Sequence, residues 1–112
     1  MEISSLQFNA LLCIREFGPL TMGELGKHLF VACSTATDLA DRMERARLVE
    51  RVRDNNDRRM VRLRLLDKGN EIVDAVITER QNFLGEVLKN YTEDEYQQLL
   101  QSLDLLEQRM NL

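Results

Sequence analysis

The sequence contains no tryptophan, one proline and one histidine, His28, in 112 residues. Its two cysteines, Cys13 and Cys33, lie twenty positions apart without a CxxC pair, which excludes a zinc site and argues against a disulfide. No apolar run approaches the roughly 18–20 residues that span a bilayer, and the first residues lack the pattern of a secretory signal. We therefore expect a cytoplasmic protein without a membrane-spanning segment.

The residue patterns of enzymes are also missing. The chain has no glycine-rich phosphate loop, no cluster of metal-ligating side chains, and no serine–histidine or cysteine–histidine arrangement beyond its one histidine. These absences argue against an enzyme and against a cofactor. What is present is an ordinary globular composition, 44% hydrophobic and 30% charged, of a size that suits one domain.

Positive charge is concentrated in the middle of an otherwise acidic chain. Residues 27–64 hold ten lysines and arginines against six acidic residues, whereas the rest of the chain holds five against thirteen, which gives the net charge of −4. Seven positive charges lie in RVRDNNDRRMVRLRLLDKG, residues 51–69, which we call the basic segment. It is either a solvated surface or a patch that faces phosphates, and charge alone leaves both readings open.

Three helix starts are marked by capping boxes, in which Ser or Thr precedes Gln or Glu by three positions, at Ser4, Thr21 and Thr92. Apolar residues at helical spacing predict that the first helix ends at Gly18 and that its core face consists of Leu6, Ala10, Cys13, Ile14 and Phe17. A short helix follows Thr21, and two long helices, from about residue 67 to 89 and from 92 onward, close the chain.

A further helix is predicted over residues 34–45, and its two faces differ sharply. The face expected to pack on the core consists of Leu39, Ala40 and Met43. The face expected to point outward consists of Thr35, Thr37, Asp38, Asp41, Arg42 and Arg45.

After this helix the period changes to that of strands. Residues 49–53 approach an apolar–polar alternation, and residues 60–65 show it clearly, with Val61, Leu63 and Leu65 on one side. Between them lies Asp-Asn-Asn-Asp, residues 54–57, and these residue types favour turns. The sequence therefore predicts a β-hairpin with arginines at its tip.

This order of elements predicts a winged helix-turn-helix, a mostly α-helical fold with a small β-hairpin wing. We expect residues 1–66 to form this lobe and residues 67–112 to form long C-terminal dimerisation helices, in one compact domain overall. A major groove admits one α-helix, so the helix over residues 34–45 is the candidate recognition helix. The wing, residues 53–60, would reach the minor groove, where the negative potential favours an inserted arginine.

The segments LTMGELGKHL, STATDLADRMERARLVER and DRRMVRLRLLDKG resemble the multiple antibiotic resistance regulator (MarR) family. Its most specific motif, Asp-x-Arg of the wing, is matched by Asp57 and Arg59. The resemblance implies a dimeric winged-helix transcription factor, usually a repressor, and many members respond to small phenolic or lipophilic ligands or to oxidants. Members normally have about one more helix before the point where this sequence starts, so we expect a trimmed chain or a differently built dimer.

Several residues depart from the family pattern. Ala32 and Cys33 stand where Ser and Arg usually open the recognition helix, and Asp38 stands where a basic residue is common. Asp38 would repel phosphate or favour a cytosine donor. Phe30 and Arg47 occupy positions that are usually glycine.

The predicted DNA contacts follow from the two elements that would enter the grooves. They are Ser34, Thr35, Thr37, Asp38, Arg42, Arg58 and Arg59. Asp57 is predicted to support the wing by holding one of its arginines in a hydrogen-bonded pair. Cys33, near a helix N-terminus, is either a redox-sensitive thiol or an inert small residue.

We therefore predict a sequence-specific transcriptional regulator that binds pseudo-palindromic double-stranded DNA as a homodimer. The alternative is a winged-helix protein-interaction module or anti-regulator with weak or no DNA binding, which Ala32, Cys33 and Asp38 would favour. The family resemblance alone implies a small lipophilic ligand, which would lie between the dimer helices and the DNA-binding lobe, near Leu12, Phe17, Phe83 or Val87.

Overall fold

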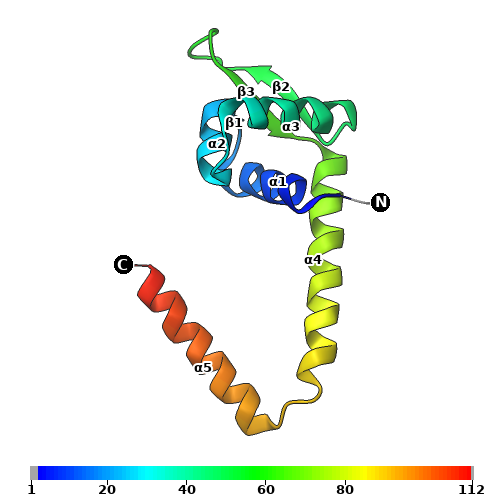
Figure 1. Cartoon of the computed structure of the whole chain (residues 1–112), viewed down its shortest axis with the longest axis vertical. Coiled ribbons are helices and arrows are strands. Elements are labelled where there is room, and N and C mark those ends of the chain that lie inside the picture. Colours follow the sequence, from blue (N-terminus) through cyan, green and yellow to red (C-terminus); the bar gives the residue numbers. More distant parts are fainter. Residues whose placement is uncertain (1–2, 112) are drawn as a thin grey trace. The chain divides into compact units, whose positions relative to one another are not determined.

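The computed structural model describes residues 3–111, which form five helices and a three-stranded antiparallel sheet (Figure 1). In chain order these are α1 (Ser5–Phe17), β1 (Leu20–Thr21), α2 (Met22–Leu29), α3 (Cys33–Arg45), β2 (Val49–Arg53), β3 (Val61–Leu65), α4 (Asp67–Leu88) and α5 (Glu93–Met110). The chain divides into two compact units, Met1–Val76 and Ile77–Leu112, so the division falls inside α4. The predicted boundary after residue 66 lies earlier, at the start of α4, and stays a prediction.

The three predicted capping boxes are confirmed. Ser4, Thr21 and Thr92 each accept the backbone N–H of the residue three positions on, and the Gln or Glu at that position accepts the N–H of the capping residue. Each pair satisfies two N–H groups that a helix start would otherwise leave without a partner. The starts of α1, α2 and α5 are thereby fixed by local sequence.

The predicted hairpin is confirmed as β2 and β3, paired antiparallel with Val49 opposite Leu65 and Arg53 opposite Val61. The sheet has one strand that the sequence did not reveal. Strand β1 pairs with β3 through Leu20 opposite Leu63, so the strand order is β1-β3-β2 and β3 is central. A strand of two residues is too short to show an alternating pattern.

The core of the first unit is formed by one face of each helix and by the sheet. Helix α3 buries Ala36, Leu39, Ala40 and Met43, which confirms the predicted inner face. Helix α1 corrects a prediction, because Phe17 is 54% exposed while Phe8 and Leu11 are buried. Ala10 and Ile14 are buried as predicted, so the inner face of α1 consists of Phe8, Ala10, Leu11 and Ile14 and is shifted from the predicted one. The Phe17 ring instead stacks on His28 at a centroid distance of 4.3 Å.

The second unit leaves its apolar side chains in solvent. Helix α5 has no buried residue among those the structure describes. Nine large apolar side chains of this unit are at least 40% exposed: Phe83, Leu84, Val87, Tyr91, Leu100, Leu103, Leu105, Leu106 and Met110. A single soluble chain rarely leaves so many large apolar side chains in solvent.

None of the helices in the described part of the chain is both long enough and apolar enough to cross a membrane.

Candidate nucleic-acid interface

Helices α2 and α3 are joined by a tight turn. The N–H of Val31 donates to the carbonyl oxygen of Gly26 at 3.0 Å, and a Cβ added to Gly26 would lie 3.0 Å from the Val31 carbonyl oxygen. The turn also holds Phe30 in the left-handed region, at φ 58°, with its side chain in solvent. This geometry is that of a helix-turn-helix, in which α2 packs behind α3 and leaves the outer face of α3 free.

The outer face of α3 carries the residues that the sequence predicts for base contact. Ser34, Thr35, Asp38 and Arg42 are exposed. Thr37 is half-buried, and its hydroxyl donates to the carbonyl oxygen of Cys33 at 2.9 Å, so it is less available than predicted. Helix α3 begins at Cys33, one residue before the predicted start.

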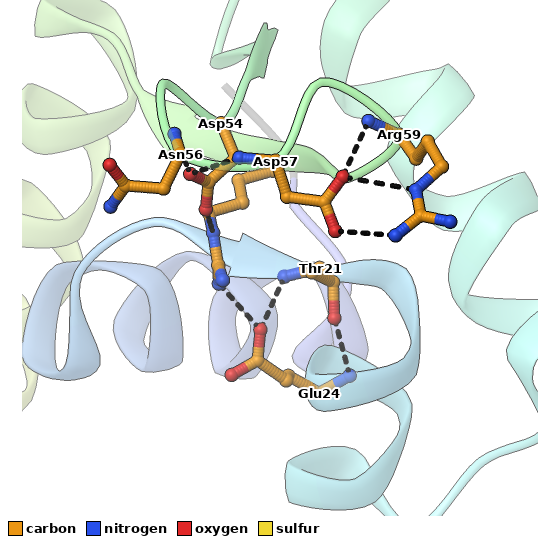
Figure 2. A network of polar contacts seen from close by, with 7 residues as sticks. Thr21, Glu24, Asp54, Asn56, Asp57 and Arg59 are labelled. Carbon is orange, nitrogen blue, oxygen red and sulfur yellow. Dashed lines mark hydrogen bonds and ion pairs between the residues drawn. The ribbon is translucent and has the colours of Figure 1, made fainter.

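The wing is the β2–β3 hairpin, whose connecting loop comprises residues 54–60 (Figure 1). The Asp54 carboxylate accepts the N–H groups of Asn56 at 2.8 Å and Asp57 at 3.3 Å, which folds the loop back on itself (Figure 2). At the base of the loop, the N–H of Asp54 donates to the carbonyl oxygen of Met60 at 2.9 Å. The turn predicted from Asp-Asn-Asn-Asp is therefore stabilised by its own side chains.

Arg59 is held at the tip of the wing by Asp57. One carboxylate oxygen of Asp57 accepts the backbone N–H of Arg59 at 3.0 Å and its Nε at 3.2 Å, and the other accepts Nη2 at 3.5 Å (Figure 2). The Arg59 side chain is nevertheless 93% exposed. Arg58 is exposed beside it, and its carbonyl oxygen accepts a hydrogen bond from Arg53 at 2.8 Å. An oriented, exposed guanidinium suits insertion into a narrow minor groove.

Arg62 connects the wing to helix α2. Its Nε donates to Asp54 at 2.8 Å, and its Nη1 donates to Glu24 at 2.7 Å. Glu24 is also the carboxylate of the α2 capping box and accepts the N–H of Thr21 at 3.0 Å (Figure 2). The hydrogen bond from Arg62 is the main reason that the pKa of Asp54 is lowered, while the Thr21 N–H is the main reason that the pKa of Glu24 is lowered.

Other arginines of the basic segment are also engaged within the protein. Arg51 donates to Asp41 at 2.6 Å and pairs with Glu44, so β2 is tied to α3. Arg64 pairs with Glu50 on the neighbouring strand. Whether the basic segment can face phosphates therefore differs from one arginine to the next, since some are paired within the protein and others are not. Within residues 3–111, the arginines with exposed side chains and no ion pair include Arg42, Arg47 and Arg58.

The cysteines are free thiols in different surroundings. Cys33 is exposed at the first residue of α3, and Cys13 is half-buried in α1. Burial, with a smaller contribution from Glu16, raises the pKa of the Cys13 thiol. Among the described residues, no group of three or more His, Cys, Asp or Glu side chains could hold a metal ion.

Comparisons with known proteins identify the family. The model of the MarR family matches residues 3–61. An uncharacterised HTH-type transcriptional regulator of Bacillus subtilis, YsmB, is 44% identical over 108 residues, covering 96% of this chain and 74% of that protein. The curated relatives are longer, and this chain spans between 48% and 74% of the length of the first four.

Solved structures give the same result. A MarR family protein from Bacillus stearothermophilus superposes with a TM-score of 0.87 at 45% identity, covering 100% of this chain and 78% of that one. Streptococcus pneumoniae FabT, solved in complex with DNA, superposes with a TM-score of 0.76 at 26% identity, covering 98% and 77%. The chain belongs to the MarR family of winged helix-turn-helix transcriptional regulators.

Proposed function

We propose that this regulator is a repressor that binds pseudo-palindromic DNA as a homodimer, with α3 in the major groove and wing residues 53–60 in the minor groove. The observation that carries the proposal is Arg59, a 93% exposed guanidinium held in a fixed direction by Asp57 at the tip of the hairpin. Because Asp57 already restricts the conformation of Arg59, the side chain loses little further conformational entropy when it enters a minor groove.

The exposed face of α3 supports the major-groove contact. Ser34 and Thr35 near the start of α3 supply hydroxyl groups, which can donate or accept at base edges or phosphates. Arg42, one turn beyond Asp38, supplies a positive charge. Asp38 accepts hydrogen bonds only, so it would favour a cytosine amino group in the groove.

The exposed apolar side chains of the second unit support self-association. Leu103 and Leu106 of α5 are 52% and 55% exposed, and both would be buried by a second copy of the chain. A two-fold dimer would place its two recognition helices one helical turn of DNA apart, which matches a pseudo-palindromic site. The proposal includes a cytoplasmic location, beside the DNA, and a role in binding rather than in catalysis.

The family resemblance implies a small lipophilic ligand, and this remains part of the proposal. The redox role suggested for Cys33 also remains a prediction. It is supported by exposure of the thiol at the first residue of α3, where oxidation would add a polar group beside the proposed DNA contact.

Fluorescence anisotropy tests DNA binding directly. The probes are the DNA upstream of the protein's own gene and a scrambled duplex, each measured across a salt series, with the wild-type chain and Arg59→Ala. We expect selective binding that falls steeply with salt, because phosphate contacts release counterions. Arg59→Ala should weaken binding by about 1–3 kcal/mol, as for removal of one specific contact.

Lys89→Ala is the matched control, since it removes one exposed positive charge from the second unit. It should bind like the wild type. Equal, feeble binding of both duplexes, unchanged by Arg59→Ala, would instead favour the protein-interaction module.

Analytical ultracentrifugation tests the dimer. Leu103→Glu places a charge on the exposed apolar surface and should shift the chain toward the monomer. Ser102→Glu introduces the same charge at the neighbouring position and should leave the dimer intact. A dimer that is insensitive to Leu103→Glu would show that α5 does not form the interface.

A further inference from the structure

A continuous set of hydrogen bonds joins the start of α2 to the tip of the wing. Thr21 and Glu24 cap each other at the start of α2, and Glu24 accepts from Arg62. Arg62 also donates to Asp54, whose other carboxylate oxygen accepts the N–H of Asp57. Asp57 in turn holds Arg59 (Figure 2). Arg62 is the only member of this set that bonds to both α2 and the wing loop.

The position of Arg62 in the sheet explains how it reaches both sides. It lies on the central strand β3, with Thr21 of β1 opposite on one side and Val52 of β2 opposite on the other. From this register its planar guanidinium extends one nitrogen toward Glu24 and another toward Asp54. A lysine has a single ammonium group and does not reproduce this fixed fork.

A two-stranded hairpin alone leaves its tip weakly fixed, because isolated hairpins are only marginally stable. In this protein the wing loop has a second attachment through Arg62, near the helix that braces α3. The direction of the wing relative to the recognition helix is therefore fixed by a side chain as well as by the strands.

We propose that Arg62 is a positioning residue, which sets the direction in which the wing presents Arg59 to DNA by joining Asp54 of the wing to Glu24 of α2. This inference rests on the proposed DNA-binding function and extends it to a residue that the sequence did not single out. Arg62 acts through Arg59 and does not contact DNA.

The burial and the bonding of Arg62 separate this role from a direct phosphate contact. Its side chain is 26% exposed, whereas that of Arg59 is 93% exposed. Two nitrogens of Arg62 are already bonded to carboxylates that compensate its charge. For Nε or Nη1 to reach a phosphate, Arg62 would have to leave a carboxylate partner and uncover it beside DNA.

The test uses a duplex that the wild-type chain selects from a random DNA library, with affinity measured by anisotropy across a salt series. Arg62→Met keeps the length of the side chain and removes both bonds, and it should weaken binding about tenfold, within the range of coupling energies between residues that share a network. Arg62→Lys keeps the charge without the fork and should also weaken binding. Neither variant should change the salt slope by the unit expected for a lost phosphate contact.

Arg64→Met is the matched control, because Arg64 lies two positions along the same strand and pairs with Glu50, outside the wing loop. It should bind DNA like the wild type. Thermal unfolding of all three variants shows that each is folded at the temperature of the binding assay.

A double-variant cycle tests whether Arg62 acts through Arg59. Once Arg59→Ala has removed the wing contact, adding Arg62→Met should weaken binding by less than twofold, because no guanidinium remains to be positioned. Additive losses, wild-type affinity of Arg62→Lys, or equal effects of Arg62→Met and Arg64→Met would each overturn the proposal while leaving DNA binding intact. If the wild-type chain selects no duplex, the proposed function fails, and this inference fails with it.

Discussion

The guanidinium of Arg51 on strand β2 lies 2.6 Å from the carboxylate of Asp41 on helix α3. A second nitrogen of Arg51 pairs with Glu44, one turn closer to the end of the same helix. The hydrogen bond to Asp41 is the main reason that the pKa of Arg51 is raised. The sheet that carries the wing is thus also tied to the recognition helix, because Arg51 of β2 binds two carboxylates of α3.

Arg51→Met should lower the free energy of unfolding by about 1 kcal/mol, the upper end for ion pairs that solvent still screens. The Asp41 and Glu44 side chains are 48% and 39% exposed, so water partly replaces the lost partner. In thermal unfolding this corresponds to a fall in Tm of about 4 °C for a chain of this length. Arg64→Met serves as the control, because the Arg64 side chain is 57% exposed against 28% for Arg51 and pairs with one carboxylate, that of Glu50. Equal losses for both variants would contradict a special role for Arg51.

Substitution by alanine should have opposite effects on stability at Gly69 and Gly85, both in α4. A Cβ on Gly69 would overlap the carbonyl oxygen of Leu48 and lie 2.8 Å from Cδ1 of Leu65. The Leu48 carbonyl cannot move away from the added Cβ without losing its hydrogen bond from the N–H of Leu66, at 3.0 Å. We expect Gly69→Ala to destabilise the protein by about 1–3 kcal/mol, as overpacking does.

At Gly85 nothing lies within 4 Å of an added Cβ. Gly85→Ala should therefore stabilise the protein by about 0.5–1 kcal/mol through helix propensity. Urea unfolding of both variants measures the two signs. A loss of stability at Gly85 would mean that a second copy of the chain packs closely against this part of α4.

The features that the sequence predicted are those determined within a few neighbouring residues. Ser4 and Gln7 cap a helix whatever lies around them, and the alternation in residues 61–65 specifies a strand with one buried side. The inner face of α3 follows in the same way from the spacing of Leu39, Ala40 and Met43.

The features that the sequence did not reveal depend on which distant segments meet. Arg62 and Glu24 are separated by 38 positions, and their ion pair requires β1 to place the start of α2 beside β3. Arg51 and Asp41 meet only because β2 folds back along α3. In the sequence these arginines resembled Arg58 and Arg59, since composition does not distinguish an arginine paired within the protein from one that is free to meet DNA.

Replacing Phe30 by glycine should stabilise the protein. Its backbone is left-handed, at φ 58° and ψ 42°, and its side chain is 95% exposed, so packing does not offset the strain. Phe30→Gly should stabilise the protein by about 1 kcal/mol, the cost of this conformation for a residue with a Cβ. Phe30→Ala keeps the Cβ and should leave the stability near that of the wild type. Equal gains for both variants in urea unfolding would point to the exposed ring rather than to the backbone.

Acid should weaken the two ion pairs through which Arg62 joins Glu24 of α2 to Asp54 of the wing. The pKa values of Glu24 and Asp54 are both lowered in the folded protein, so the folded state binds fewer protons than the unfolded chain as these groups titrate. Their contribution to stability is therefore complete at neutral pH and is lost as the pH falls below about 4, through the folded pKa values. Glu24→Gln can still accept the Thr21 N–H but does not titrate, so its stability should fall less steeply with pH in this range. Glu107→Gln, which removes an exposed carboxylate from α5, controls for the lost charge, and identical pH profiles for the two variants would show that Glu24 does not contribute to the pH dependence.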